Sequence, residues 1–92
     1  MGLMPENFVR SLDALDSFLD AEIRVGIIFA DTAMRYRRAG DVAKYETTKH
    51  NALRVLAVID RLKSRLPKNL KAKIELGRVQ LAKGISELTI MG

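Results

Sequence analysis

Two long stretches of the chain, Ile23–Ala30 and Ala52–Ile59, are almost wholly apolar, and both lie about the same distance from Gly40-Asp41. Glycine often ends a helix in the left-handed conformation, and aspartate often caps the start of the next helix. The chain is therefore expected to reverse at Gly40, which would lay the two apolar stretches side by side. This symmetry predicts an antiparallel helical hairpin.

The first predicted helix starts near Pro5 or Asn7 and ends at Gly40, and a break near Asp16-Ser17 would instead give a short leading helix. Its apolar residues recur every three or four positions, in a main stripe and a second stripe beside it. A helix with so wide an apolar arc normally contacts two partners. The main stripe contains Leu12, Leu15, Leu19, Ile23, Ala30 and Met34, and the second contains Phe18, Val25, Phe29 and Tyr36.

Two further helices follow. The second is predicted from Val42 to Arg65 or Leu66, where Pro67 stops it, and Asn69 is predicted to cap the third. The apolar positions of the third helix are Leu70, Ile74, Leu81, Ile85 and Leu88, with Gly77 and Gly84 one heptad apart. These glycines indicate either a closely packed neighbouring helix or simple tolerance of glycine.

The fold expected from these patterns is all-α. Residues 1–92 would form one domain, a three-helix antiparallel bundle with a long first helix that associates with itself. The apolar positions exceed what one three-helix core needs, so we interpret Phe18, Val25, Phe29 and Tyr36 as an interaction surface for a second copy or another protein. The alternative is that the long helices wrap one another more fully within one chain.

The first hairpin resembles a tetratricopeptide repeat over residues 30–53. The resemblance rests on Ala33, Tyr36, the Gly40-Asp41 turn and Ala52-Leu53, which match the small, aromatic, turn and second-helix alanine positions of that repeat. The chain departs from the repeat at Tyr45 and Lys49, and no second copy follows at a 34-residue period. The resemblance implies a protein-binding role.

The sequence offers little for catalysis or for cofactors. The chain has no cysteine, its one histidine, His50, has no suitable serine nearby in the sequence, and no glycine-rich loop is present. Glu46 and His50 are four residues apart on a predicted helix, which is more typical of a surface pair than of a metal site. We expect no catalytic residues, no metal and no cofactor, and an adaptor rather than an enzyme.

A small helical enzyme is the alternative from a different class. The chain is similar in length and helix number to the intertwined all-helical chorismate mutases, whose sites hold a dicarboxylate with inward-facing basic residues. Arg24 and Arg54 lie in apolar stretches, and Gln80 is on the third helix, but the Arg-Glu pair on the second helix of that family is missing. Both arginines are instead expected to reach the surface on their aliphatic stems.

Charge is distributed unevenly along the chain. Residues 1–34 carry six acids and two bases, whereas residues 35–92 carry fourteen bases and five acids, within a net charge of +5. Lysines at the start of the third helix oppose its dipole, so the second functional hypothesis is a site for anions or nucleic-acid phosphates. The alternatives are a solvated face, or pairing with Asp13, Asp16 and Asp20. The basic cluster contains Arg61, Lys63, Arg65, Lys68, Lys71 and Lys73.

The chain is expected to be cytoplasmic and not associated with membranes. The absence of cysteine suits a reducing compartment. Polar residues and Pro5 interrupt the region where a signal peptide would need its apolar stretch. The longest apolar run, Val25–Ala30, is far too short to span a bilayer.

Overall fold

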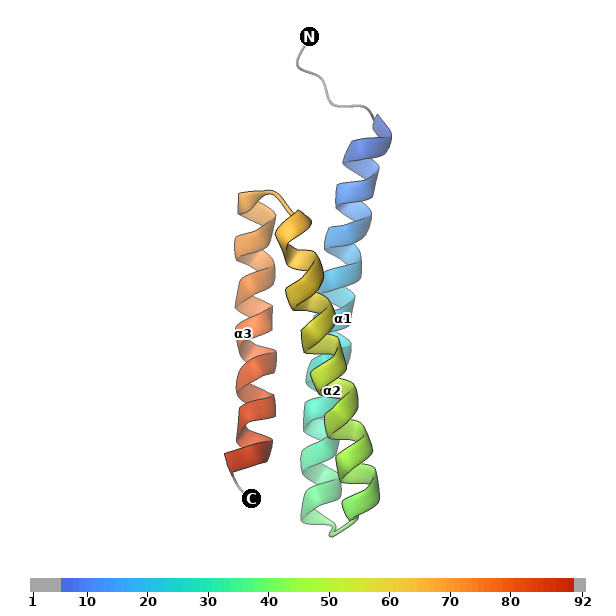
Figure 1. The fold of residues 1–92 in the computed structure, drawn as a ribbon, viewed down its shortest axis with the longest axis vertical. Helices are drawn as coiled ribbons and strands as arrows, with labels where there is room; N and C mark the ends of the chain where they lie inside the picture. The colour runs from blue at the N-terminus through green and yellow to red at the C-terminus, as the bar shows by residue number, and fades with distance from the viewer. Residues whose placement is uncertain (1–5, 91–92) are drawn as a thin grey trace.

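Three α-helices pack as an antiparallel bundle in the computed structural model, which describes the backbone of residues 6–90 and the side chains of residues 12–88 (Figure 1). α1 spans Glu6–Arg38, α2 spans Val42–Leu62 and α3 spans Lys68–Ile90, with a short 3₁₀ turn, η1, at Lys63–Arg65. The backbone of residues 6–90 contains no strand. The predicted all-α, three-helix bundle is confirmed, and α1 is continuous, without a break near Asp16.

The turn between α1 and α2 forms as its residues predict. Gly40 has φ of 77°, the left-handed conformation that glycine adopts without a steric cost. Its N–H donates to the Arg37 carbonyl at 3.1 Å, and the N–H of Asp41 donates to the Tyr36 carbonyl at 3.0 Å. This pair of hydrogen bonds is a Schellman motif. The Asp41 carboxylate then accepts from the Lys44 N–H at 3.1 Å and caps α2.

The second connection differs slightly from the prediction. α2 ends at Leu62, before the predicted Arg65 or Leu66, because the chain tightens into η1 and the Leu66 N–H donates to the Lys63 carbonyl at 3.1 Å. Leu66 itself is extended, with ψ of 148°, as the following proline requires.

The predicted cap at Asn69 is wrong, because α3 already begins at Lys68. The carbonyl of Pro67 accepts the first helical hydrogen bond, from the Lys71 N–H at 2.8 Å, so Pro67 occupies the capping position. Pro67 contributes no side-chain acceptor to this end of α3, and Asn69 lies in the first turn.

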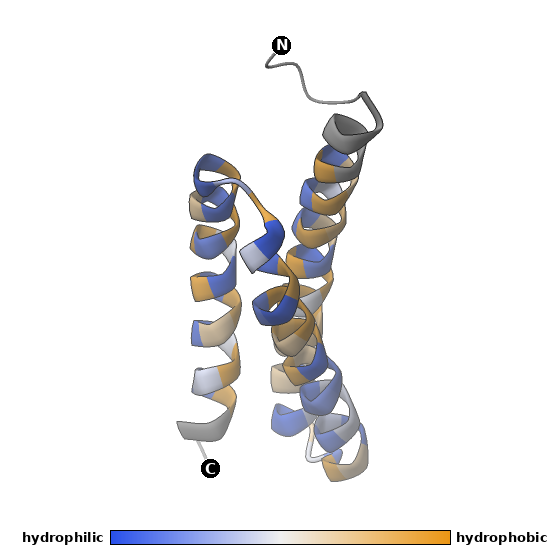
Figure 2. Ribbon diagram, turned by 45° about the horizontal axis from the view of Figure 1, so that its top comes forward, coloured by the Kyte–Doolittle hydropathy of each residue, from blue (hydrophilic) through white to orange (hydrophobic). Residues whose placement is uncertain are grey.

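One apolar core runs along the axis of the bundle, and all three helices contribute to it. Figure 2 shows that every helix carries both apolar and polar residues. Leu19, Ile59 and Leu81 are fully buried, one from each helix. The remaining buried apolar residues are Ile23, Ala30, Ala33, Ala52, Val55, Leu66, Ile74, Ile85 and Leu88.

Gly26 lies where side chains from the other two helices meet α1. A Cβ atom at this position would lie 2.7 Å from a Leu81 methyl carbon and 2.9 Å from a Val55 methyl carbon. Gly77 also approaches α1 closely, since its Cβ would lie 2.9 Å from the end of the Ile23 side chain, whereas a Cβ on Gly84 would make an ordinary contact of 3.5 Å. The predicted close approach therefore holds at Gly77 and not at Gly84.

The C-terminal part of α3 is tied to the hairpin by polar contacts. The Leu88 carbonyl accepts hydrogen bonds from the Arg37 guanidinium at 2.7 Å and from the Tyr45 hydroxyl at 3.1 Å. Because the last four carbonyls of a helix lack helical partners, these donors from α1 and α2 satisfy a group that α3 cannot satisfy itself.

Alanine substitutions at Gly26 and Gly84 should have opposite effects on stability. Gly84→Ala should stabilise the bundle by up to about 1 kcal/mol, since alanine is the better helix former and the site has room. Gly26→Ala should destabilise it by about 1–3 kcal/mol, because the added methyl group overlaps two packed side chains. Denaturant unfolding of both variants would measure this. Equal stabilisation by both would mean that the three helices do not meet closely at Gly26.

Candidate interaction surfaces

One edge of α1 carries a row of exposed apolar side chains. Phe18, Val25 and Ile28 are 45%, 40% and 61% exposed. With the exposed Ala14 and Ala21 they are spaced alternately four and three residues apart. This is the heptad spacing by which one helix packs along another. We call these five residues the α1 seam.

The four residues predicted as an interaction surface occupy different environments. Phe18 and Val25 belong to the α1 seam. Phe29 is half-buried and packs against the core, and Tyr36 is half-buried with the Lys44 ammonium 5.6 Å from its ring centre. Ile28 was not among the predicted surface residues, although its spacing from Phe18 and Val25 was a signal for it.

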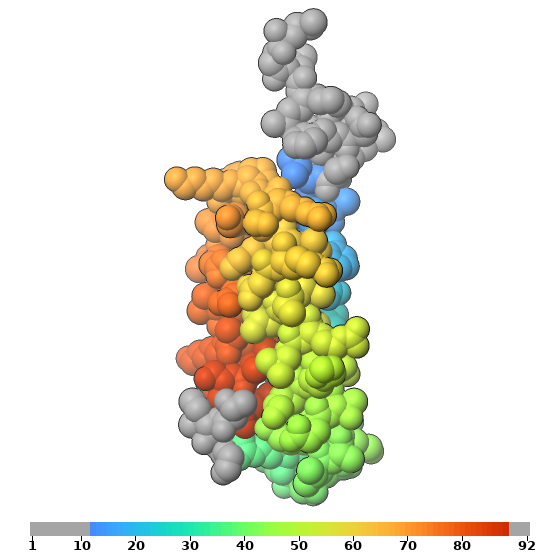
Figure 3. Space-filling model, viewed as in Figure 1, coloured from blue at the N-terminus to red at the C-terminus, as the bar shows by residue number. Residues whose placement is uncertain are grey.

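Among the side chains of residues 12–88, the other exposed apolar residues do not form a comparable row, and Ile27 of α1 is only 37% exposed. α3 exposes Leu76 and Val79, which are 73% and 54% exposed, and α2 exposes Val42 and Leu53 well apart along its length. Figure 3 shows the face of the molecule on which α2 lies in front of α1, with α3 at the left. Isolated exposed apolar residues are common on protein surfaces and indicate no site.

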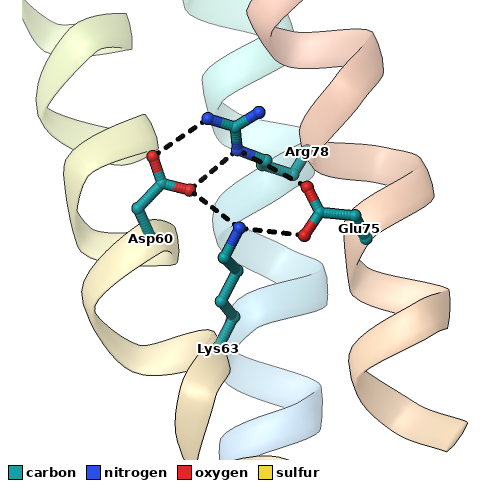
Figure 4. Close-up of polar contacts among 4 residues, drawn as sticks. All are labelled: Asp60, Lys63, Glu75 and Arg78. Carbon is teal, nitrogen blue, oxygen red and sulfur yellow. Dashed lines mark hydrogen bonds and ion pairs between the residues drawn. The ribbon is translucent and has the colours of Figure 1, made fainter. Parts of the chain in front are cut away.

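The basic corner predicted from the sequence is partly neutralised by a four-residue ion network between α2, η1 and α3 (Figure 4). Lys63 donates to Glu75 at 2.9 Å and lies 3.4 Å from Asp60. Arg78 donates to both carboxylate oxygens of Asp60, at 2.7 and 3.1 Å. The network contains two acids and two bases, so Lys63 adds no net charge to the corner.

The network shifts the titration of Asp60 and Lys63 toward their charged forms. Hydrogen bonding by Arg78 lowers the pKa of Asp60, and hydrogen bonding to Glu75 raises the pKa of Lys63. The stabilisation from Asp60 is therefore present above the usual carboxyl pKa and lost as pH falls through the lowered pKa. That from Lys63 is present at neutral pH and lost as pH rises through its raised pKa. At neutral pH all these charges are paired.

Lys73 pairs with the acidic part of α1. Its ammonium donates to Asp16 at 2.9 Å, and this hydrogen bond raises the pKa of Lys73. The side chain of Asp16 is only 19% exposed, and its second oxygen is buried without a hydrogen-bond partner. Of the three acids proposed as mates for the basic cluster, Asp16 is the one that makes this ion pair.

The other four members of the basic cluster are exposed. Arg61, Arg65, Lys68 and Lys71 form no ion pair with the part of the chain whose side chains the structure describes. Lys68 and Lys71 lie in the first two turns of α3, where the helix dipole favours anions. The structure thus divides the predicted cluster into two paired lysines and four unpaired cations.

The residues considered for a small enzyme do not converge. Arg24 points outward with a 76% exposed side chain and pairs with Asp20 at 2.9 Å. Arg54 is exposed at a shallow hollow of about 290 Å³ between α1 and α2. Gln80 lines a different groove, of about 480 Å³, between α1 and α3. Neither of these two hollows, which are lined by described residues, brings the three side chains together.

The two lysines that differ in pairing should respond differently to charge reversal. Lys73→Glu should lower the thermal midpoint, because it removes the partner of the largely buried Asp16 and places two acids together. Lys71→Glu is the matched control, since it should leave stability unchanged or raise it by a few tenths of a kcal/mol through the helix dipole. If the two variants had the same thermal midpoint, the Lys73–Asp16 pair would contribute nothing to the bundle.

The comparisons add no functional assignment. Neither the family models, nor the curated proteins, nor the solved structures contain a match to this chain. Across the described helices, no segment is long and apolar enough to cross a membrane. Among the described side chains, no three potential metal ligands of the His, Cys, Asp or Glu type gather in one place.

Proposed function

We propose that this protein is a small helical interaction module, without catalysis, that binds through the α1 seam. The observation that supports this is the exposure of Phe18, Val25 and Ile28 along one edge of one helix. Contiguous exposed apolar surface on a small domain is typical of a binding site rather than of an ordinary solvated face. The resemblance of residues 30–53 to a tetratricopeptide hairpin agrees with a protein-binding role.

The alternative explanation for the apolar excess is fuller wrapping of the helices within one chain. It accounts for Phe29 and Tyr36, which are half-buried. It leaves the α1 seam unexplained, because the core already contains fully buried side chains from all three helices while Phe18, Val25 and Ile28 are still 40–61% exposed. The seam is therefore the surface to which we assign binding.

The spacing of the seam also favours one kind of partner. A four-three alternation of apolar residues presents side chains that insert between those of a second helix with a similar pattern. An amphipathic helix is therefore the expected binding element, and a cytoplasmic location is part of this proposal because a chain without cysteine suits a reducing compartment.

A single charge in the seam should abolish partner binding without harming the fold. Val25→Glu places a carboxylate in the middle of the seam, and Leu76→Glu is the matched control at an exposed apolar residue of α3. Both variants should unfold within about 0.5 kcal/mol of the unchanged protein. Tagged protein would be used to isolate bound partners or further copies of itself. Equal retention of the same partners by both variants would exclude the seam as the binding surface.

The second candidate function is phosphate binding at the basic corner. It is favoured by Arg61, Arg65, Lys68 and Lys71, which form no ion pair with the described side chains. Binding of labelled DNA or RNA should then weaken steeply as salt rises, with little sequence preference. Lys71→Glu should lower the slope of the logarithm of the binding constant against the logarithm of salt concentration by about one, the value expected for the loss of one phosphate contact. Absence of binding at low salt would end this hypothesis.

A further inference from the structure

We propose that the partner of the α1 seam is a second copy of this chain, with the two α1 helices packed side by side and antiparallel. This inference rests on the proposed function, because it names the occupant of the same surface. It is supported by three features of α1, namely where the seam lies along the helix, how large its side chains are, and how the charges beside it are distributed.

The seam lies at the middle of the helix. It runs from Ala14 to Ile28, and the next position in its spacing is the half-exposed Thr32. The midpoint of that row falls at residue 23, and the midpoint of α1, Glu6–Arg38, falls at residue 22. A two-fold axis near residue 23 would therefore superimpose the two helices over almost their whole length. Such an arrangement buries both seams completely, as a self-complementary interface requires.

The side chains of the seam complement one another in this register. Phe18 would lie opposite the partner's Ile28, and the small Ala21 opposite the partner's Val25. Ala14 would lie opposite the partner's Thr32 at each end of the interface. A small residue facing a larger one, as Ala21 would face the partner's Val25, allows two helices to approach and interdigitate near the axis.

The charges on α1 favour the antiparallel direction. Four acids and no base lie between residues 12 and 22, whereas three arginines lie between residues 35 and 38. An antiparallel partner would place Asp13 near the partner's Arg35, which also pairs with Asp31 of its own chain at 3.0 Å, and this contact occurs twice by symmetry. A parallel partner would place acids beside acids and arginines beside arginines. Near the axis Arg24 would face the partner's Arg24, but each is already paired with Asp20 of its own chain.

The first test is the oligomeric state of the purified full chain. Sedimentation at micromolar concentration should show a dimer for the unchanged protein and for Leu76→Glu. Val25→Glu should be monomeric, with the dissociation constant raised more than about tenfold by a carboxylate buried at the interface. Circular dichroism would confirm that each variant remains helical. A monomeric unchanged protein would overturn the proposal, as would a dimer that tolerates Val25→Glu.

The second test determines the direction of the two helices. The natural chain has no cysteine, so single cysteines can be introduced cleanly at two exposed polar positions that flank the seam, as Ser17→Cys and Asp31→Cys. In the antiparallel register residue 17 lies within about 3 Å, along the axis, of residue 31 of the partner, while two copies of residue 17 lie about 18 Å apart along the axis. A short bis-maleimide should therefore link the two variants when mixed and should not link Ser17→Cys to itself. Efficient self-linking of Ser17→Cys would indicate a parallel pair and overturn the proposal.

The failure of this inference can be distinguished from the failure of the proposed function. If the purified chain is monomeric but Val25→Glu loses a partner that Leu76→Glu retains, the seam binds a different protein and only the self-association is wrong. If the chain is monomeric and neither variant changes partner binding, the α1 seam has no binding role and both proposals fall.

Discussion

The bundle depends on the close contact of three helices at Gly26. There the absence of a side chain lets methyl groups of Val55 and Leu81 approach the backbone of α1. A short distance along the helix, Ala30 and Ala33 continue the row of small residues on this face and are both buried. Small residues on α1 thus bring α2 and α3 close along one side of it, and this arrangement leaves the opposite edge uncovered. The α1 seam is therefore exposed because α2 and α3 both pack against the other side of α1.

The sequence predicted the architecture well because local signals mark its two connections. Gly40 adopts the expected left-handed conformation, and Pro67 keeps Leu66 extended. The start of α3 was predicted wrongly because Asn69 was assumed to cap the helix with its side chain. The first helical hydrogen bond is instead accepted by the carbonyl of Pro67. A cap is inferred from residue type alone, but the first hydrogen bond of a helix depends on how the preceding turn closes.

The candidate surfaces were less predictable, because both depend on where distant residues come to lie. The apolar arc of α1 is so wide that its pattern does not reveal which edge faces α2, and for this reason Phe29 was grouped with Phe18 although only the latter is exposed. The basic cluster was similarly ambiguous. Lys63 and Lys73 donate hydrogen bonds to acids that lie 12 and 57 residues away in the sequence, although Lys63 also has Asp60 three residues before it. No local pattern indicates such distant partners. In the sequence, the paired Lys63 and Lys73 therefore cannot be told apart from Lys68 and Lys71.

The contacts of α3 with the hairpin fix its position along the bundle at three separated levels. Near its start Glu75 and Arg78 join the ion network, in its middle Leu81 packs over Gly26, and near its end the Leu88 carbonyl accepts from Arg37 and Tyr45. Sliding α3 by one helical turn, about 5.4 Å, would break all three sets of contacts at once. The position of α3 along the bundle is therefore determined by its contacts with α1 and α2 and not by the length of the loop before it.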